Sequence, residues 1–167
     1  MNGGVEVVRL AEQADFEAIW GVYMEAREFM RQTGNPSQWG DFYPTVSMLE
    51  QDIERKELYV IDREEGICGV FLLVNGPDPW YAEIDDGEWQ SDAPYYVIHR
   101  VAAKSAAKGI FAECLAFALS KDQHLRIDTH EDNKVMQHIL EKNGFVRCGI
   151  VYVHERRSPR IAYERTK

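Results

Sequence analysis

The side chains best suited to chemistry are two histidines and a glutamate near the middle of the chain. His99 stands in the run 95–103, whose β-branched and aromatic residues predict a strand, and His130 follows a second predicted strand, 125–129. Glu83 lies among aromatic residues in an acidic stretch. An imidazole or a carboxylate can take a proton from a reacting group, and the pKa of histidine lies closest to neutral pH. Each also has a structural interpretation: a hydrogen-bonded core histidine, a turn residue before a helix, or a solvated acid.

The loop 104–109 is a candidate binding site for an anion. It joins the strand 95–103 to a predicted helix, 110–119, and carries a serine, small residues and two lysines. A loop that opens a helix presents free backbone N–H groups, which suit phosphate groups. Gly109 is its only glycine, so the spacing matches neither a Walker loop nor a dinucleotide fingerprint. The loop therefore predicts a phosphate-bearing ligand other than an ordinary NTP or NAD.

The elements that position these residues read as a mixed α/β layer. Strands are predicted at 5–10, 57–61, 67–74, 95–103, 125–129, 145–153 and 160–164, with a further short strand considered at 81–84. Helices are expected from a cap at Asp15 to about Gly34, from a cap at Thr45, over 110–119, and from a cap at Asp132 or Asn133 to a stop at Asn143-Gly144.

Composition places the chain among globular proteins. Its 167 residues suit one domain, 1–167, and an apolar content of 45% argues against disorder. The formal net charge of −9 argues against nucleic acid as a main partner. The charge is compatible with a cationic small substrate, although solubility alone could explain it.

No apolar run approaches the ~20 residues of a membrane helix, and the N-terminus carries no signal pattern, so a cytoplasmic protein is expected. Cys68, Cys114 and Cys148 have no zinc spacing and are expected to be reduced core thiols. The histidines show no helix-face metal spacing, so no metal is predicted. The other three histidines, His124, His138 and His154, are expected at the surface.

From Val101 onward the chain resembles the GNAT acetyltransferase superfamily. Residues 101–115 are similar to the strand, pyrophosphate loop and helix of that family. Residues 132–145, DNKVMQHILEKNGF, are similar to its second motif, an Asn-led helix ending in a Gly-Phe pair. The element order over 5–165 also fits, so the resemblance covers essentially the whole chain. It implies a mixed, mostly antiparallel central sheet of six to seven strands flanked by about four helices.

The resemblance implies direct transfer of an acetyl group from acetyl-CoA to an amine. The main chain of Val101, Ala102 and Ala103 would hold the pantetheine and polarise the thioester carbonyl. The pyrophosphate would be held by the backbone N–H groups of Ala106, Ala107, Lys108, Gly109, Ile110 and Phe111. Asn133 and Met136 would line the other side of coenzyme A. His99, Glu83 and His130 are the candidate general bases, since an alkyl ammonium with a pKa near ~10 must lose a proton to react.

The chain departs from the family pattern at three positions. Ala106 and Phe111 stand where the family loop usually has a basic residue and a small one, and only Gly109 agrees. Leu140 replaces the family's common general-acid tyrosine, so an acid would be water or another group, for which Tyr96 and Tyr152 offer hydroxyls. An N-acetyltransferase stays the leading hypothesis, and these departures are the reason to keep an alternative, a non-catalytic acyl-CoA-binding or sensing module.

A small, cationic primary amine is the expected acceptor. The loop aromatics Trp39, Tyr43, Trp80 and Tyr81 could line its pocket by cation–π contacts, or could simply pack under two long loops. Pairing of the C-terminal strands between chains would make a homodimer, which the sequence leaves open.

Overall fold

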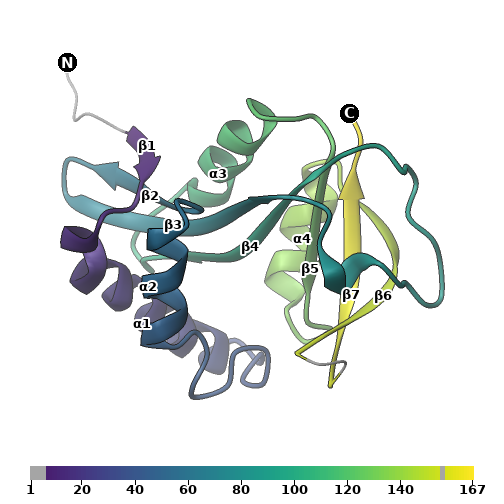
Figure 1. The fold of residues 1–167 in the computed structure, drawn as a ribbon. Helices are drawn as coiled ribbons and strands as arrows, with labels where there is room; N and C mark the ends of the chain where they lie inside the picture. Colours follow the sequence, from purple (N-terminus) through teal and green to yellow (C-terminus); the bar gives the residue numbers. More distant parts are fainter. Residues whose placement is uncertain (1–6, 155–156) are drawn as a thin grey trace. The chain divides into compact units, whose positions relative to one another are not determined.

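The computed structural model describes residues 7–154 and 157–167 as an alternation of strands and helices (Figure 1). In chain order the elements are β1 (Val7–Leu10), α1 (Phe16–Gln32), α2 (Val46–Glu54), β2 (Leu58–Arg63), β3 (Gly66–Asn75), β4 (Tyr96–Ala103), α3 (Ile110–Leu119), β5 (Leu125–Thr129), α4 (Lys134–Lys142), β6 (Val146–Val153) and β7 (Ser158–Arg165). Short 3-10 helices, η1 (Gln13–Asp15) and η2 (Pro79–Tyr81), complete this part of the chain. Every helix in these ranges is too short or too polar to cross a membrane.

The strands form a seven-stranded sheet in the order β1-β2-β3-β4-β5-β7-β6. Strands β4 and β5 pair in parallel, whereas β1–β2, β2–β3, β5–β7 and β6–β7 pair antiparallel. The described ranges thus hold a mixed, mostly antiparallel sheet with four α-helices, which confirms the predicted fold class and element order. Residues 5 and 6 of the first predicted strand lie outside the described residues.

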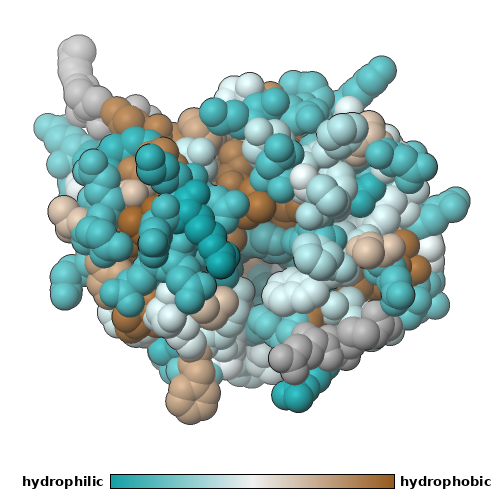
Figure 2. Space-filling model, viewed as in Figure 1, coloured by the Kyte–Doolittle hydropathy of each residue, from teal (hydrophilic) through white to brown (hydrophobic). Residues whose placement is uncertain are grey.

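The chain divides into two compact units. The first comprises Met1–Leu73 and Arg100–Phe117, and the second comprises Val74–His99 and Ala118–Lys167. Strands β3 and β4 and helix α3 each contribute residues to both units. That residues 1–167 form one domain stays a prediction. Figure 2 shows hydrophilic side chains over most of the visible face, in keeping with the net charge of −9.

The core of the first unit lies on both faces of β2 and β3. Tyr59 and Phe71 stack on one face, where the ring of Phe117 from α3 lies 4.8 Å from that of Tyr59. The buried Leu58 and Leu72 oppose each other in the ladder and point to the other face, because neighbouring side chains of a strand alternate. Helices α1 and α2 lie on that side (Figure 1). Apolar residues on both faces explain why β3 reads as a nearly continuous hydrophobic run.

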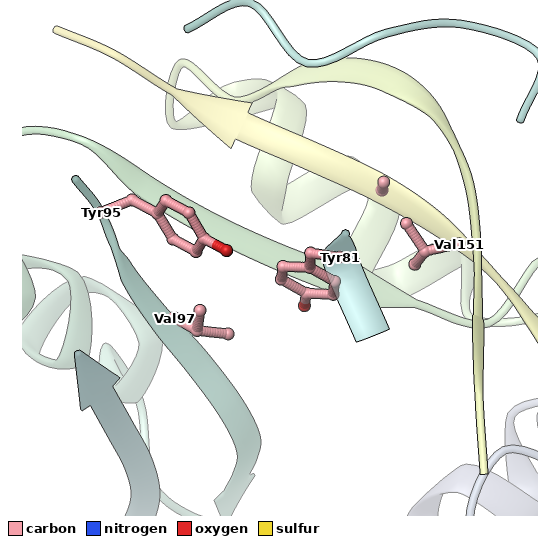
Figure 3. Close-up of a cluster of buried hydrophobic side chains, with 5 residues drawn as sticks. Tyr81, Tyr95, Val97 and Val151 are labelled. Carbon is pink, nitrogen blue, oxygen red and sulfur yellow. The ribbon is translucent and has the colours of Figure 1, made fainter. Parts of the chain in front are cut away.

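The core of the second unit is an aromatic and aliphatic cluster under the β3–β4 connection, residues 76–95. Tyr81 and Tyr95 of this connection pack with Val97, Val151 and Ala162 from β4, β6 and β7 (Figure 3). The phenol rings lie over the strands and bury apolar area that the strands alone could not cover. This cluster fixes the connection on the sheet, and the connection carries several of the polar residues described below.

Two glycines allow the connection to approach β6 closely. Asp85 and Ile150 exchange backbone hydrogen bonds of 2.8 Å, which form an isolated bridge between the connection and the strand. A Cβ at Gly87 would lie 1.8 Å from the carbonyl oxygen of Cys148, and one at Gly149 would lie 2.5 Å from that of Asp85. Side chains are therefore excluded from both positions, since no real Cβ lies so close to a backbone oxygen.

One predicted element is wrong. Residues 81–84, considered as a strand, do not form one: Tyr81 ends the 3-10 helix Pro79–Tyr81, and residues 82–84 are irregular. An aspartate-proline pair explains the difference: the side chain of Asp78 accepts a hydrogen bond from the Trp80 N–H at 2.9 Å, and Pro79 suits the first helical position.

The predicted helix caps are confirmed at two positions and wrong at one. Thr45 Oγ1 accepts from the Met48 N–H, and Asn133 Oδ1, not Asp132, accepts from the Met136 N–H. The carboxylate of Asp15 does not cap α1, because it binds the Arg9 guanidinium and the Glu12 N–H. The three cysteines are buried and unbridged, as predicted.

Gly87→Ala should destabilise the protein by about 3 kcal/mol or more, because the new methyl group can be placed only by moving backbone. Gly21→Ala is the matched control: it lies in α1 with no atom within 4 Å of the added Cβ, and should stabilise by about 0.5–1 kcal/mol. Chemical denaturation of both variants checks the pair. Equal stabilities would contradict the close approach at Gly87.

Candidate functional site

His99 lies between two carboxylates in the second unit. Its Nε2 is 2.9 Å from Oδ2 of Asp78, and its Nδ1 is 4.0 Å from Oδ2 of Asp128. The side chain is 18% exposed, so it is shielded from solvent but reachable. Two carboxylates around one imidazole favour its protonated form, because each adds an attractive charge.

The register of the parallel strands places His99 and Asp128 together. Val97 of β4 pairs with Arg126 of β5, and the next residue on the same face of each strand is His99 or Asp128. The Tyr81 hydroxyl donates to Oδ2 of Asp128 at 2.6 Å. The guanidinium of Arg160 on β7 lies 3.8 Å from Oδ1 of Asp128. Asp128 is thus held on both oxygens and cannot easily turn away from His99.

Asp78 is positioned by the connection itself. One carboxylate oxygen caps η2 at the Trp80 N–H, which leaves Oδ2 for His99. The Asp78 N–H donates to the Tyr95 hydroxyl at 2.9 Å. The backbone of Asp78 and its carboxylate are therefore both fixed, so His99 meets a carboxylate of defined orientation.

The surroundings shift three pKa values. Burial alone would lower the pKa of His99, but the hydrogen bond to Asp78 and the charges of Asp128 and Asp78 outweigh it, and the pKa is raised above its usual value of 6.5. Burial pushes the pKa of Asp78 upward, yet His99 and the Trp80 N–H hold it below its usual value. Burial, followed by the Asp128 carboxylate, raises the pKa of Tyr81 well above 10.0. At neutral pH, Tyr81 is a phenol and Asp78 a carboxylate.

The other two candidate bases lie elsewhere. Glu83 is exposed on the connection. The carboxylates that pair with His99 are those of Asp78 and Asp128. His130 accepts the Asp132 N–H on Nδ1 at 3.0 Å, as expected of a turn residue before a helix. Burial, then the positive charge of Arg160, lowers the pKa of His130 despite the acids nearby.

The loop 104–109 belongs to the first unit and fits an anion by its backbone. Gly109 has a φ of 73°, a left-handed conformation that suits glycine, and an added Cβ there would meet no atom within 4 Å. Ala106 is exposed and Ala107 half-buried, while Phe111 is buried in the first turn of α3 and does not fill the loop. The loop itself is therefore built of small or exposed residues.

One carboxylate already binds the loop. Oε2 of Glu25 in α1 accepts the Ser105 N–H at 2.7 Å. The guanidinium of Arg63 donates to the Lys108 carbonyl at 2.8 Å and pairs with Glu113. The loop is thus tied to α1 on one side and to β2 on the other.

Arg100 interrupts β4 just before the segment 101–103. Its φ of 49° is unusual for a non-glycine residue, and such a residue breaks the regular alternation of side chains. The Tyr23 hydroxyl donates to the Arg100 carbonyl at 2.9 Å, and the guanidinium binds Asp52 and the Tyr43 hydroxyl. These contacts hold the conformation of Arg100.

The remaining predicted site residues lie as follows. Val101 and Ala103 are half-buried and Ala102 is buried in β4, Lys108 is exposed, and Ile110 is buried at the start of α3. Asn133 caps α4, Met136 is half-buried in its first turn, and Leu140 is fully buried, so no hydroxyl stands there. Among the expected pocket aromatics, Trp39 packs on Tyr23 and Tyr43 in the first unit. In the second unit Tyr81 is buried and Trp80 is exposed against His154.

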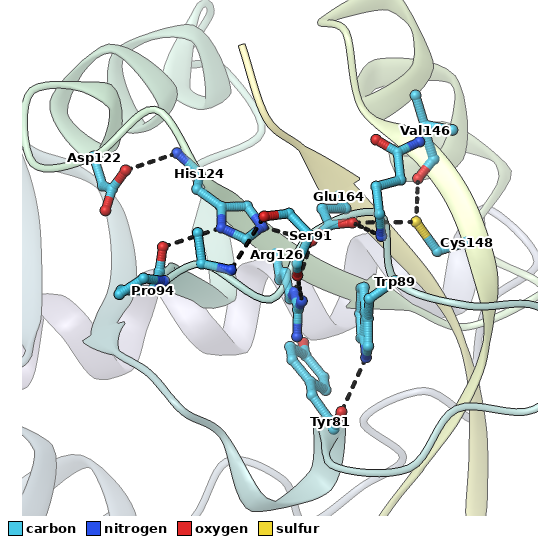
Figure 4. Close-up of polar contacts among 12 residues, drawn as sticks. Tyr81, Trp89, Ser91, Pro94, Asp122, His124, Arg126, Val146, Cys148 and Glu164 are labelled. Atoms are coloured by element: carbon cyan, nitrogen blue, oxygen red, sulfur yellow. Dashed lines mark hydrogen bonds and ion pairs between the residues drawn. The ribbon is translucent and has the colours of Figure 1, made fainter.

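The surface prediction for His124 is wrong. His124 is buried, with Nε2 2.5 Å from the Glu164 carboxylate and Nδ1 3.0 Å from the Pro94 carbonyl (Figure 4). Arg126 donates to the same carboxylate at 2.9 Å. The prediction failed because Glu164 is 40 residues away in sequence. His138 is exposed, as predicted, and His154 is half-buried.

Sequence reasoning missed Asp78, Asp128 and Arg126. Asp128 and Arg126 are charged residues in a short buried strand, which is a signal for partnered or functional groups. Asp78 stands in the run NGPDP, which is typical of a turn, and its contacts are with His99 and Tyr95, both distant in sequence.

Known proteins resemble this chain over most of its length. Residues 7–146 match a family model described as an acetyltransferase (GNAT) domain. A curated relative from Bacillus subtilis (strain 168), named uncharacterized N-acetyltransferase YesJ, is 23% identical over 146 residues, which are 81% of this chain and 78% of the relative.

Solved structures of GNAT-family acetyltransferases are also similar to this chain. A GNAT-family acetyltransferase from Streptococcus agalactiae 2603 is similar over 97% of this chain and 95% of its own, with a TM-score of 0.84 and 29% identity. A GNAT-family acetyltransferase from Listeria monocytogenes 4b F2365 covers 96% of this chain and 94% of its own, with a TM-score of 0.70 and 22% identity, which shows a shared fold.

Asp128→Asn should lower the pKa of His99, because it removes one of the two negative charges that favour the imidazolium. Asp132→Asn is the matched control: Asp132 lies 3.7 Å from His130, so that variant should lower the pKa of His130 and leave His99 unchanged. An NMR titration of the histidine ring protons measures both. An unchanged pKa of His99 in Asp128→Asn would contradict the contact.

Proposed function

This chain belongs to the GNAT acetyltransferase family, and we propose that it transfers the acetyl group of acetyl-CoA to the amine of a small acceptor, with His99 as the general base. Acetyl transfer is the reaction class of the family, so an enzyme is favoured over a non-catalytic sensor. The single observation that supports the assignment of the base is the position of His99 between Asp78 and Asp128.

The hydrogen bonds of His99 support a specific path for the proton. The carboxylate of Asp78 accepts from Nε2, so the neutral imidazole carries its proton there and has its lone pair on Nδ1. Nδ1 takes the proton of the acceptor ammonium, and the Asp128 carboxylate 4.0 Å away stabilises the imidazolium that forms. Tyr81 and Arg160 keep that carboxylate in place.

The residues of the loop 104–109 fit the pyrophosphate of coenzyme A. Its side chains are small or exposed, Gly109 leaves open space, and α3 begins at Ile110, so backbone N–H groups can face phosphate oxygens. Acetyl-CoA, when bound, supplies the acetyl group as a thioester whose C–S bond breaks as the C–N bond to the acceptor forms. Further contacts with coenzyme A stay predictions for Val101, Ala102, Ala103, Asn133 and Met136.

A cationic amine is the acceptor that the electrostatics favour. Asp78 and Asp128 lie beside the base, and the net charge of −9 adds a long-range attraction for cations. A carboxylate that binds the ammonium also holds it beside the base before the proton moves. A homodimer formed by pairing of the C-terminal strands, of which β6 is an outer strand of the sheet, stays a prediction.

Release of free coenzyme A from acetyl-CoA in the presence of a panel of small amines tests the function. His99→Gln should lower kcat/KM by about 10²- to 10⁴-fold, the usual contribution of a general base. His138→Gln is the control, because His138 is exposed in α4. Thiol release that never exceeds hydrolysis with any amine would overturn the proposal.

The pH profile of kcat/KM gives a second test. The neutral imidazole is the base, so activity rises as the pH passes upward through the pKa of His99. Since that pKa is raised, the rise should lie at higher pH than for an ordinary histidine. Asp128→Asn should move the rise to lower pH. A profile that is identical in the two proteins would argue against His99 as the base.

Glu25→Gln should tighten binding of coenzyme A by roughly 2- to 5-fold, because a negative charge at the Ser105 N–H repels phosphate and competes for a backbone donor. Glu28→Gln removes the same charge from the same helix away from the loop, where Glu28 pairs with Arg31, and should change the affinity little. Isothermal titration at low salt compares the two. Weaker binding in Glu25→Gln would show that the carboxylate supports the loop.

A further inference from the structure

A pocket of about 510 Å³ opens beside His99, entirely within the second unit. The β3–β4 connection forms one side with Asp78, Tyr81, Trp89, Asp92 and Tyr95, and Arg126 of β5 forms part of the other. A pocket of this size can hold a small metabolite. Asp78 belongs both to the wall of the pocket and to the pair with His99, so a ligand in this pocket would lie next to the proposed base.

Arg126 has one nitrogen left for a ligand. The side chain is only 6% exposed, and its Cζ lies 4.0 Å from the ring centroids of both Trp89 and Tyr95. Nε donates to Glu164 at 2.9 Å and Nη2 donates to the Ser91 carbonyl at 2.7 Å (Figure 4). Within residues 7–154 and 157–167 no hydrogen bond or ion pair uses Nη1. A guanidinium has donors only, so an acceptor group from a ligand is what this nitrogen can bind.

The negative charge of Asp78 lies on the other side of the Tyr95 side chain from the Arg126 guanidinium. The ring of Tyr95 stacks on Arg126, and its hydroxyl accepts the Asp78 N–H. Asp78 suits the cationic end of a ligand, and Asp92 adds a second, exposed carboxylate to the wall. The pocket therefore offers a donor for an anion at one end and carboxylates for an ammonium at the other, with the aromatic rings of Tyr81 and Trp89 between them.

We propose that this pocket binds the acceptor and that the acceptor is a small amino carboxylate. Its ammonium group lies at Asp78, next to His99, and its carboxylate accepts a hydrogen bond from Nη1 of Arg126. Its hydrocarbon part lies against Tyr81 and Trp89. This assignment rests on the proposed acetyl transfer and narrows the acceptor from any cationic amine to one that also carries an acid group.

Matched acceptors test the assignment on the unmodified protein. Each ω-amino carboxylate, from β-alanine to 5-aminopentanoate, is compared with the alkylamine of the same length, and each α-amino acid with its amide. The amino carboxylates should show a kcat/KM on the order of 10- to 100-fold higher, as expected for one charge-assisted hydrogen bond. Equal values within every pair, or a preference for the alkylamines, would overturn the proposal.

Two arginine variants test whether Arg126 causes the preference for amino carboxylates over alkylamines. Arg126→Gln should reduce the ratio within the best pair to about one, because kcat/KM for the amino carboxylate falls further than kcat/KM for the alkylamine. Arg147→Gln removes the same charge from an exposed position of β6 and should keep the full ratio. An unchanged ratio in Arg126→Gln would overturn the proposal.

Binding without acetyl-CoA separates the pocket from the reaction and does not depend on a folded Arg126 variant. The indole N–H of Trp89 donates to the Tyr81 carbonyl at 2.9 Å, so its NMR signal, assigned with Trp89→Phe, reports on the pocket wall. The signal should shift with at least one amino carboxylate of the panel and stay unchanged with the alkylamine of the same length. If no amine is acetylated but this shift occurs, acetyl transfer fails and the pocket stands; if the shift is absent, the pocket assignment fails.

Discussion

The packing of the second unit depends on the hydrogen bonds of one buried carboxylate, that of Glu164. It has no exposed area and accepts hydrogen bonds from His124, Arg126 and the Gln90 N–H. Burial would raise its pKa, but these donors hold the pKa below its usual value. Its stabilising contribution is therefore complete above the pKa of the unfolded chain and is lost as the pH falls through the folded value. Because Gln90 belongs to the β3–β4 connection, this charge joins β5 and β7 to the segment that covers them.

The same network explains how a connection with little regular structure can carry site residues. Arg126 and His124 also bind the carbonyls of Ser91 and Pro94, so buried side chains satisfy backbone groups that a loop would otherwise expose. Removing one member would leave charges buried without partners, which typically costs about 3–5 kcal/mol. The connection is thus held at Gln90, Ser91 and Pro94 by buried side chains, while the Tyr95 hydroxyl binds the Asp78 N–H and the Trp89 indole binds the Tyr81 carbonyl.

Much of the fold could be predicted from the sequence, because its signals are local. Hydrophobic periodicity, the caps at Thr45 and Asn133 and the stop at Gly144 act within a few residues, and the seven strands followed from them. Predictions failed where a distant partner decided the outcome, as at His124, or where two local signals competed, as in residues 81–84. The site shows the same limit: residue type and the predicted strand were enough to make His99 a candidate base, which stays a prediction. Asp78 and Asp128 become its partners only through strand pairing and the Tyr95 hydroxyl.

The bridge between Asp85 and Ile150 divides the connection into two loops with different contacts. The first carries Asp78 and Tyr81 and contacts His99, while Asp92 of the second lines the pocket. A substitution at Asp92 changes the pocket wall and spares the contacts of Trp89 and Tyr95 with the first loop, and Gly87 and Gly149 hold the dividing point against β6. A protein of this architecture can change which molecule it accepts while keeping the apparatus that removes the proton.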